Sequence, residues 1–302
     1  MQQRRRIAAY GLCRDDERVL LTRGSPLCDF PGIWQIPGGG LDHAEHPALG
    51  VVREFAEETG LEVTVAGIRA VLADVIRLDD IGVAMHTDRV IYDVTVRSGG
   101  LRHEVDGTTD LVAWLTLDEA AAVPMMPFTA ELLGLPVAPL AEPPARAAPR
   151  GPLAPLPPDR RQRFGAYGVV TDPAGRVLLA QIAPGYPGAG NWHLPGGGTD
   201  HGEQPVSALL RELVEESGQL GRVTGLLDVN NLHNPAAVGP EGRPLDWHGV
   251  RVIYRVEVTA PTEPEVTELA GSTAKAAWFA PDSLFRLRLS DLAARALRLA
   301  LR

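Results

Sequence analysis

Two motifs dominate the first part of the chain, Trp34-Gln-Ile-Pro-Gly-Gly-Gly40 and Arg53-Glu-Phe-Ala-Glu-Glu-Thr-Gly60. Both return at a constant offset, as Trp192-His-Leu-Pro-Gly-Gly-Gly198 and Arg211-Glu-Leu-Val-Glu-Glu-Ser-Gly218. A glycine run directly before a segment of helical periodicity predicts a tight loop that leads into a helix. Because the period is far longer than that of a solenoid repeat, the pattern predicts a duplicated domain.

A proline-rich segment separates the two copies. Residues 136–158 contain nine Pro and six Ala among 23 positions. Proline lacks a backbone donor and has a fixed φ, so neither a helix nor a sheet is expected to continue through this segment. We therefore expect domains at residues 1–135 and 159–302, joined by an extended, semi-rigid linker.

Hydrophobic periodicity and turn residues predict the same elements in both copies. Hairpins are expected at 7–12 with 18–22 and at 165–171 with 176–180, and further strands at 90–96 and 252–258. Helices are expected at 46–59 and 204–217, each with Pro in its first turn and Gly after its end. Short helices near 117–122 and 128–133 would close the first copy. A helix over 282–302 would close the second, its buried stripe formed by Leu284, Leu287, Leu292, Leu297 and Leu299.

The two glutamate-rich helices carry the chemistry. Glu54, Glu57 and Glu58 fall on one helix face, and Glu212, Glu215 and Glu216 repeat the spacing. Carboxylates so placed repel one another, and a hard divalent cation relieves that repulsion. A solvated acidic helix face has the same pattern. The adjacent glycine loop and Arg53 favour instead a site where water attacks phosphorus.

The complete pattern Gly39-x5-Glu45-x7-Arg53-Glu54-Phe55-x-Glu57-Glu58-x-Gly60-Leu61 resembles the signature of the Nudix hydrolases. The second copy, Gly197-x5-Glu203-x7-Arg211-Glu212-Leu213-x-Glu215-Glu216-x-Gly218, departs from it only at Gln219, where the signature has an aliphatic residue. That position is expected to pack, so Gln219 bears on local stability. The resemblance implies tandem Nudix domains, each an α/β/α sandwich around a mixed sheet.

The resemblance also implies a site for Mg²⁺ or Mn²⁺ and cleavage of a nucleoside diphosphate linked to a further moiety. By position, Glu57 and Glu58 would be metal ligands, Glu54 a ligand or the general base, and the Gly38 carbonyl a further ligand. Arg53 would orient the glutamates. The same roles fall in the second copy to Glu215, Glu216, Glu212, Gly196 and Arg211. Family members differ in their general base, so Glu57 and Glu215 are also considered for it. The substrate is expected to contact Gly39, Gly40, Gly197 and Gly198.

A further acidic residue in a late loop often completes such sites. Glu104 aligns with Glu268 when the copies are matched, which predicts a shared role as an extra ligand or base. A loop acid without a role is the alternative. Asp106 and Asp110 become Ala270 and Ala274 in the second copy and are weaker candidates.

Three more matched pairs have open interpretations. Arg89 and Arg251 either contact a substrate phosphate or lie at solvent-exposed strand ends. His86 and His248 either contact the substrate from a strand rim or are satisfied locally. Trp34 and Trp192 either stack on a nucleobase or, as we favour, pack beneath the glycine loop.

Charge and composition restrict the function. Residues 1–135 carry 12 basic and 21 acidic side chains, and residues 159–302 carry 15 and 16. The excess of acidic side chains in residues 1–135 repels a nucleic-acid backbone, so we expect no nucleic-acid partner. No long apolar run or secretory signal is recognisable, and Cys13 and Cys28 are too few for a disulfide framework. The expected location is therefore cytoplasmic, with no membrane partner.

The leading hypothesis is a pyrophosphohydrolase acting on a nucleotide-type small molecule with two potential sites. The alternatives are one catalytic half with a structural or nucleotide-sensing partner half, and a non-hydrolytic nucleotide-binding module. An isoprenyl diphosphate isomerase is disfavoured because that activity relies on an added Cys and the second copy has none. Oxidised nucleotides, nucleoside triphosphates, ADP-ribose and sugar nucleotides remain open as substrates. Either a pseudodimer within the chain or a homodimer is compatible with the duplication.

Overall fold

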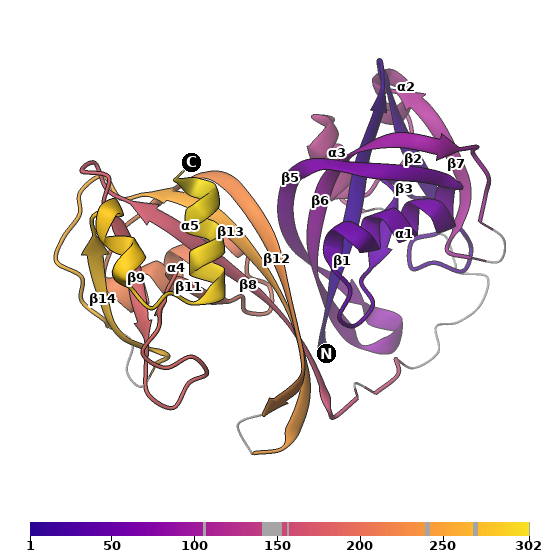
Figure 1. Ribbon diagram of the computed structural model, residues 1–302. Helices are drawn as coiled ribbons and strands as arrows, with labels where there is room; N and C mark the ends of the chain where they lie inside the picture. Colours follow the sequence, from indigo (N-terminus) through magenta and orange to yellow (C-terminus); the bar gives the residue numbers. More distant parts are fainter. Residues whose placement is uncertain (105–106, 141–152, 156, 239–241, 268–270, 302) are drawn as a thin grey trace. The chain divides into compact units, whose positions relative to one another are not determined.

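The computed structural model describes residues 1–104, 107–140, 153–155, 157–238, 242–267 and 271–301. The chain divides into two compact units, Met1–Pro157 and Pro158–Arg302 (Figure 1). Each is a mixed α+β unit whose sheet has seven strands in the described residues. No helix in these ranges is both long and apolar enough to cross a membrane.

The strands and the long helix of the first unit follow one another in an order that the second unit repeats. In the first they are β1 (Gln2–Asp15), β2 (Arg18–Gly24), β3 (Trp34–Gln35), β4 (Gly38–Gly40), α1 (Pro47–Thr59), β5 (Leu61–Leu78), a 3-10 turn (Asp79–Ile81), β6 (Val83–Gly99), β7 (Thr109–Thr116), α2 (Leu117–Ala121) and α3 (Pro127–Leu133). In the second they are β8 (Arg160–Thr171), β9 (Val177–Ile182), β10 (Trp192–His193), β11 (Gly196–Gly198), α4 (Pro205–Ser217), β12 (Arg222–Val238), β13 (Pro244–Glu257), β14 (Thr273–Phe279), a 3-10 helix (Pro281–Arg286) and α5 (Asp291–Ala300).

Both sheets are mixed, and the first strand of each unit lies at the centre. The strand order is β3-β2-β1-β6-β5 in the first unit and β10-β9-β8-β13-β12 in the second. β1 pairs with β6 in parallel, and β8 pairs with β13 in parallel, whereas the other strand pairs are antiparallel. The short glycine strands β4 and β11 pair with the middle of β1 and β8, which positions the glycine loop beside the central strand.

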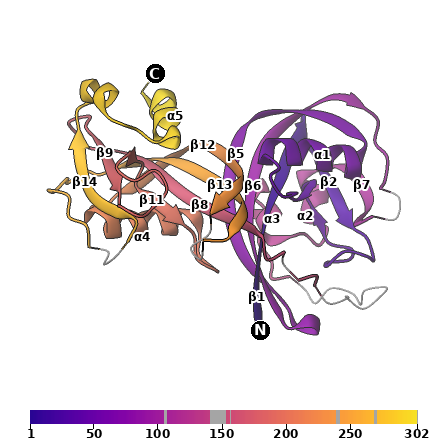
Figure 2. The same cartoon turned by 60° about the horizontal axis from the view of Figure 1, so that its bottom comes forward.

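Alternating side chains on the central strand build a helix layer on each face. Ala8, Tyr10 and Leu12 join a buried cluster with residues of α2 and α3. Gly11 faces the other way, where a Cβ would lie 2.4 Å from the Phe55 ring of α1. The second unit repeats this, because Val169 packs with α5 residues and Gly168 lies under Leu209 of α4. The expected α/β/α sandwich is therefore confirmed (Figures 1 and 2).

The predicted glutamate helices are confirmed as α1 and α4. Both begin with Pro and end at a glycine in the left-handed region, Gly60 with φ 74° and Gly218 with φ 68°. A side chain at either position would strain the backbone. The expected hairpins, later strands and short helices are also present, most of them longer than predicted because the periodicity fades at their ends.

The predicted closing helix over 282–302 is wrong. A 3-10 helix ends at Arg286, Leu287 has extended backbone, and Ser290 caps a new helix, α5. Leu284, Leu292 and Leu297 are buried as expected, but Leu299 is 37% exposed. The serine supplies the physical reason, because its side chain accepts from the Ala293 amide and starts a helix in a new direction.

Candidate active site

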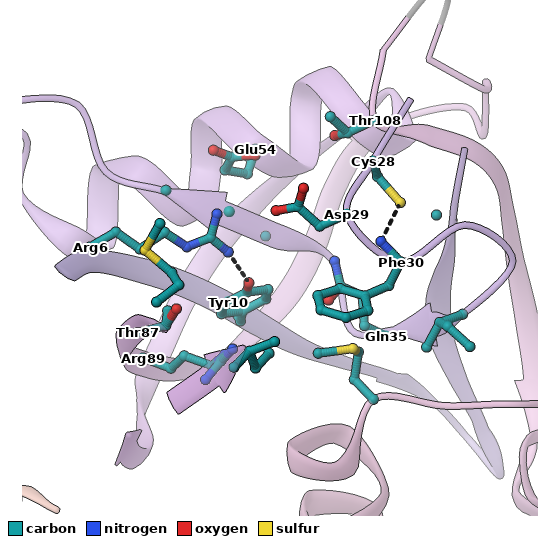
Figure 3. A pocket seen from close by; sticks show the side chains of 18 of the residues that line it. Arg6, Tyr10, Cys28, Asp29, Phe30, Gln35, Glu54, Thr87, Arg89 and Thr108 are labelled. Carbon is teal, nitrogen blue, oxygen red and sulfur yellow. Dashed lines mark hydrogen bonds between the residues drawn. The ribbon is translucent and has the colours of Figure 1, made fainter. Parts of the chain in front are cut away.

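The glycine loop and the glutamate helix meet beside the middle of the central strand. Gly38 lies opposite Tyr10 and Gly40 opposite Ala8, so the loop is a short edge strand over β1. On α1, Val51 and Phe55 are buried against the sheet. The helix therefore turns Glu54 and Glu58 toward the loop, and Glu54 lines a cavity there (Figure 3).

Glu58 is fixed from two sides in a buried position. It is 4% exposed, its Oε2 accepts from the Gly38 amide at 2.9 Å, and its Oε1 accepts from the Thr109 hydroxyl at 2.8 Å. Burial raises the pKa of Glu58 to about 8, although both hydrogen bonds act in the opposite direction. Such a carboxylate is held in place and lacks a compensating charge.

Glu54 lies directly against the loop. A Cβ on Gly39 would come within 2.6 Å of Glu54 Oε2, so this close approach requires a glycine. Burial raises the pKa of Glu54, and the neighbouring Arg53 offsets part of that shift. The carboxyl group thus has a defined position and a perturbed pKa, which are the properties of a ligand or a base.

Arg53 forms hydrogen bonds with three of the acidic residues. Its Nε and Nη2 donate to the two Glu45 oxygens at 2.9 and 2.8 Å. Its Nη1 donates to Glu54 at 2.9 Å and to Glu57 at 3.2 Å, and Nη2 also donates to the Gly40 carbonyl at 3.0 Å. These bonds hold Arg53 as the positioning residue, with the pKa of its guanidinium raised, first by its hydrogen bond to Glu45.

The second unit reproduces this arrangement. The Gly196 amide donates to Glu216 at 2.8 Å, and the Thr273 hydroxyl donates to its other oxygen. Arg211 donates to Glu203 at 2.9 Å, to Glu212 at 3.0 Å and to Glu215 at 3.0 Å. A Cβ on Gly197 would lie 2.6 Å from the Glu212 carboxyl. Both copies of the signature therefore build the same constellation.

Two of the predicted late-loop acids, Glu104 and Asp110, lie among the described residues and have different partners. Glu104 accepts from the Thr109 amide at 3.0 Å, and its charge contributes to the raised pKa of Glu58. It therefore lies near the cluster. Glu268 and Asp106 lie outside the described residues, so the pairing of Glu104 with Glu268 stays a prediction. Asp110 pairs with Arg23 at 2.8 Å.

A cavity adjoins each cluster. The first, of about 340 Å³, is lined among others by Arg6, Tyr10, Asp29, Glu54, Glu58 and Arg89. Figure 3 shows Arg6 and Tyr10 between Glu54 and Arg89. The second, of about 270 Å³, is lined among others by Arg163, Tyr167, His193, Glu216, Trp247 and Arg251. In each unit the glutamate cluster opens into a space large enough for a small molecule.

The interpretation of Arg89 and Arg251 as solvent-exposed strand ends is wrong. Arg89 is 2% exposed and pairs with Asp74 at 2.7 Å, and both arginines line their cavities. They lie inside long strands, β6 and β13, that begin well before the predicted bounds. Contact of Arg89 and Arg251 with a substrate stays a prediction.

His86 and His248 also lie inside these strands, not on a rim. Both are fully buried, His86 beside Asp88 at 3.3 Å and His248 between Gln162 at 3.1 Å and Asn231 at 2.7 Å. Local satisfaction is therefore the correct interpretation for His248, whereas His86 Nε2 is buried beside Asp88 without a hydrogen bond. Trp34 and Trp192 belong to the buried clusters, which confirms their packing role.

Several site residues were missed by the sequence reasoning. Thr109 and Thr273 hold the buried glutamates, and they share the offset that links Glu104 with Glu268. Tyr10 with Tyr167, and Arg6 with Arg163, occupy equivalent cavity positions. A systematic match of the two copies outside the signature would have revealed all of them.

The comparisons with known proteins agree with this geometry. The family model described as NUDIX domain matches residues 2–134 and 161–300. A MutT-like protein of Streptomyces ambofaciens is 35% identical over 111 residues, which cover 36% of this chain and 61% of the relative. An 8-oxo-dGTP diphosphatase of Proteus vulgaris is 40% identical over 58 residues, 19% of this chain and 52% of the relative.

These matches span less than two thirds of the curated relatives' own length. Among solved structures, a MutT NUDIX hydrolase from Burkholderia pseudomallei aligns with a TM-score of 0.37 and 32% identity, over 46% of this chain and 98% of that one.

Proposed function

The chain belongs to the NUDIX family, and we propose that it is a metal-dependent pyrophosphohydrolase of nucleoside di- or triphosphate derivatives. The observation that carries the proposal is the carboxylate cluster, built twice with the same arginine, glycine and threonine partners. Because both copies are complete in these contacts, we place a catalytic site in each unit.

The donor set suits a hard divalent cation. Glu54 and Glu58 are held at one glycine loop, and the pKa of Glu58 is raised by burial and by neighbouring acids. Mg²⁺ or Mn²⁺ would offset that excess of negative charge. We propose Glu57, Glu58 and the Gly38 carbonyl as ligands, Glu54 as a ligand or the general base, and Glu104 as an additional ligand. In the second unit the corresponding ligands are Glu212, Glu215, Glu216 and Gly196, with Glu268 as the additional one.

The bound cation would supply Lewis-acid activation of a phosphoryl oxygen and of the attacking water. The chain's own groups then position and deprotonate that water. Glu54 and Glu212 are the better placed bases, because each is pressed against the loop and held by its arginine. Glu57 is more exposed, at 53% of its side chain, and stays the alternative base with Glu215.

The remaining groups bind substrate in this proposal. The backbone of Gly39, Gly40, Gly197 and Gly198 lines the cavities and lies beside the glutamates, so the hydrolysed diphosphate would rest there. Arg89 and Arg251 face the same cavities and would contact the rest of the substrate. We place the enzyme in the cytoplasm, in accord with Cys13 and Cys28 not forming a disulfide.

The deciding experiment measures phosphate and pyrophosphate release from a nucleotide panel in Mg²⁺, in Mn²⁺ and in EDTA. The panel contains nucleoside triphosphates, 8-oxo-dGTP, ADP-ribose, sugar nucleotides and dinucleoside polyphosphates. We expect turnover of at least one class that stops in EDTA and in the Glu57→Gln, Glu215→Gln double variant. Tight nucleotide binding by the folded chain with no turnover would overturn the proposal and favour a binding module.

A further inference from the structure

Strand pairing places two arginines at the same point of the two sheets. In the first unit Gly40, Ala8 and Arg89 lie side by side on β4, β1 and β6. In the second unit Gly198, Gly165 and Arg251 occupy the same places on β11, β8 and β13. The two arginines are therefore equivalent in position, and each lines the cavity of its own unit.

The charge of Arg89 is compensated within the protein. Its Nη1 lies 2.7 Å from Asp74 Oδ1, and its guanidinium lies 4.5 Å from the centre of the Phe128 ring. Another carboxylate, that of Asp29, lines the same cavity. A ligand therefore meets an arginine that already has a counter-ion.

The charge of Arg251 has no such partner in the described residues. Its Nη2 donates to the neutral amide oxygen of Asn230, and no ion pair joins it to a described carboxylate. Its Nε is buried without a hydrogen-bond acceptor, but so are Nε and Nη1 of Arg89, so the ion pair with Asp74 is what distinguishes the two arginines. The position of Asp29 is taken by Pro187. Arg163 lines this cavity as Arg6 lines the first, so a second guanidinium is common to both. Burial lowers the pKa of Arg251, with opposing influences from Tyr167 and Asp291.

An uncompensated guanidinium in a cavity is costly, and a ligand anion would remove that cost. Asn230 cannot do so, because an amide oxygen carries only a partial charge. The second cavity therefore favours a ligand with an additional negative group. In the first cavity Asp74 already supplies that negative charge.

That negative group is not the diphosphate at the glycine loop. Adjacent strands lie about 4.8 Å apart, so Arg251 lies two strand spacings, roughly 10 Å, across the sheet from Gly198. Gly165 lies between them, and the Tyr167 ring lies beside it, 3.1 Å from where a Cβ would be. The Arg251 side chain bonds to Asn230 on β12, on the side of β13 away from the glycine loop. We therefore assign a group bound at Arg251 to the part of the substrate beyond the diphosphate.

We propose that the second cavity selects nucleoside diphosphate derivatives that carry an additional anionic group, a phosphate monoester or a carboxylate, which binds Arg251. The first cavity selects derivatives without that group, because Asp74 already forms an ion pair with Arg89. The inference rests on the proposed function for the location of the hydrolysed diphosphate.

The test uses the full chain and matched ligand pairs. NADPH against NADH varies a phosphate monoester, and UDP-glucuronate against UDP-glucose varies a carboxylate. Calorimetry in EDTA measures binding without metal-dependent turnover. We expect one anionic member to bind about tenfold or more tightly than its partner, because a charge-assisted hydrogen bond contributes on that scale. Which pair shows the preference identifies the group.

Charge variants assign the preference to one arginine. Arg251→Gln should abolish it, and Asn230→Asp should abolish it too, because the new carboxylate compensates Arg251 internally. Arg89→Gln is the matched control and should leave the preference intact. Asn230→Asp should also raise the Tm, so it remains informative if Arg251→Gln does not fold.

Two outcomes would overturn the inference: equal affinity within both pairs, or a preference that survives both Arg251→Gln and Asn230→Asp. Turnover measured separately in Mg²⁺ keeps this test apart from the proposed function. A chain that hydrolyses nucleotides without the preference refutes only the inference. A chain that shows the Arg251-dependent preference without turnover refutes only the hydrolase.

Discussion

The two units share their chemistry and differ in their cavities. Arg53 and Arg211 make the same bonds to three glutamates, and Gly38 and Gly196 donate to the same buried position of the helix. Around these clusters, Arg89 has an aspartate partner and Arg251 an asparagine. The two units therefore agree in the carboxylate cluster and differ in the residues that line the rest of each cavity.

The largest effect should come from the buried glutamates. Glu58→Gln and Glu216→Gln each remove a charged oxygen while keeping the hydrogen-bonded shape. We expect each change to lower kcat/KM in its own unit by about 100-fold or more, because ligand charge controls metal affinity. Steady-state kinetics of both single variants and the double variant would assign each substrate to a unit. Full activity in the double variant would contradict the shared chemistry.

Arg53→Gln and Arg211→Gln test the positioning role. Each leaves three glutamates without their common partner, so kcat/KM and Mg²⁺ affinity should fall by about 10- to 100-fold. Titration of Mg²⁺ against the rate separates lost metal affinity from lost turnover. Arg69→Gln is the control, because Arg69 pairs with Asp93 on the surface and should matter little. Equal effects at Arg69 would indicate a general loss of stability.

The end of the signature offers a stability comparison. Leu61→Gln buries an amide without prepared partners and should cost about 2 kcal/mol of unfolding free energy. Gln219→Leu should cost about 1 kcal/mol despite restoring the aliphatic pattern, because Gln219 bonds to Ser217 and Thr262. Urea unfolding measures both. A stabilising Gln219→Leu would show that these hydrogen bonds contribute nothing net.

A further difference between the units is a pH dependence of stability that we expect in the second unit. Burial, and then the charge of Arg251, lower the pKa of His193 to about 4. The unfolded chain binds a proton at this residue below about pH 6.5, whereas the folded unit does so only near pH 4. Its contribution to stability is therefore complete above pH 6.5 and is lost as the pH falls toward 4.

His193→Gln introduces the residue of the first unit, Gln35, and should flatten this dependence. Thermal unfolding between pH 4 and 7 measures the change in slope. An unchanged slope would show that other groups govern the acid stability of the second unit.

The signature and its surroundings made most of the fold predictable. Helix bounds followed from Pro47 and Gly60, whose backbone requirements are local. The resemblance to the Nudix signature implied that Arg53 orients the glutamates, and the structure shows its bonds to Glu54 and Glu57 and adds those to Glu45 and Gly40.

The rest depended on pairing between distant strands. Burial of Arg89 follows from parallel pairing with β1 and from Asp74 on β5, neither of which has a local signal. Gln219 seemed to be a defect because its acceptor, Thr262, lies in a distant loop. The break before α5 was missed because the leucine spacing continues through the extended backbone at Leu287.

The parallel pairing at the centre of each sheet affects how the chain reaches its native state. β1 is synthesised first, but its partner β6 comes only after β5, and both β6 and β13 contain the segment Arg-Val-Ile-Tyr. On the ribosome, the first unit can complete its sheet before β13 has emerged. A chain refolding from denaturant offers both partners to β1 at once. Strand exchange between the units is therefore a hazard of refolding that vectorial synthesis avoids.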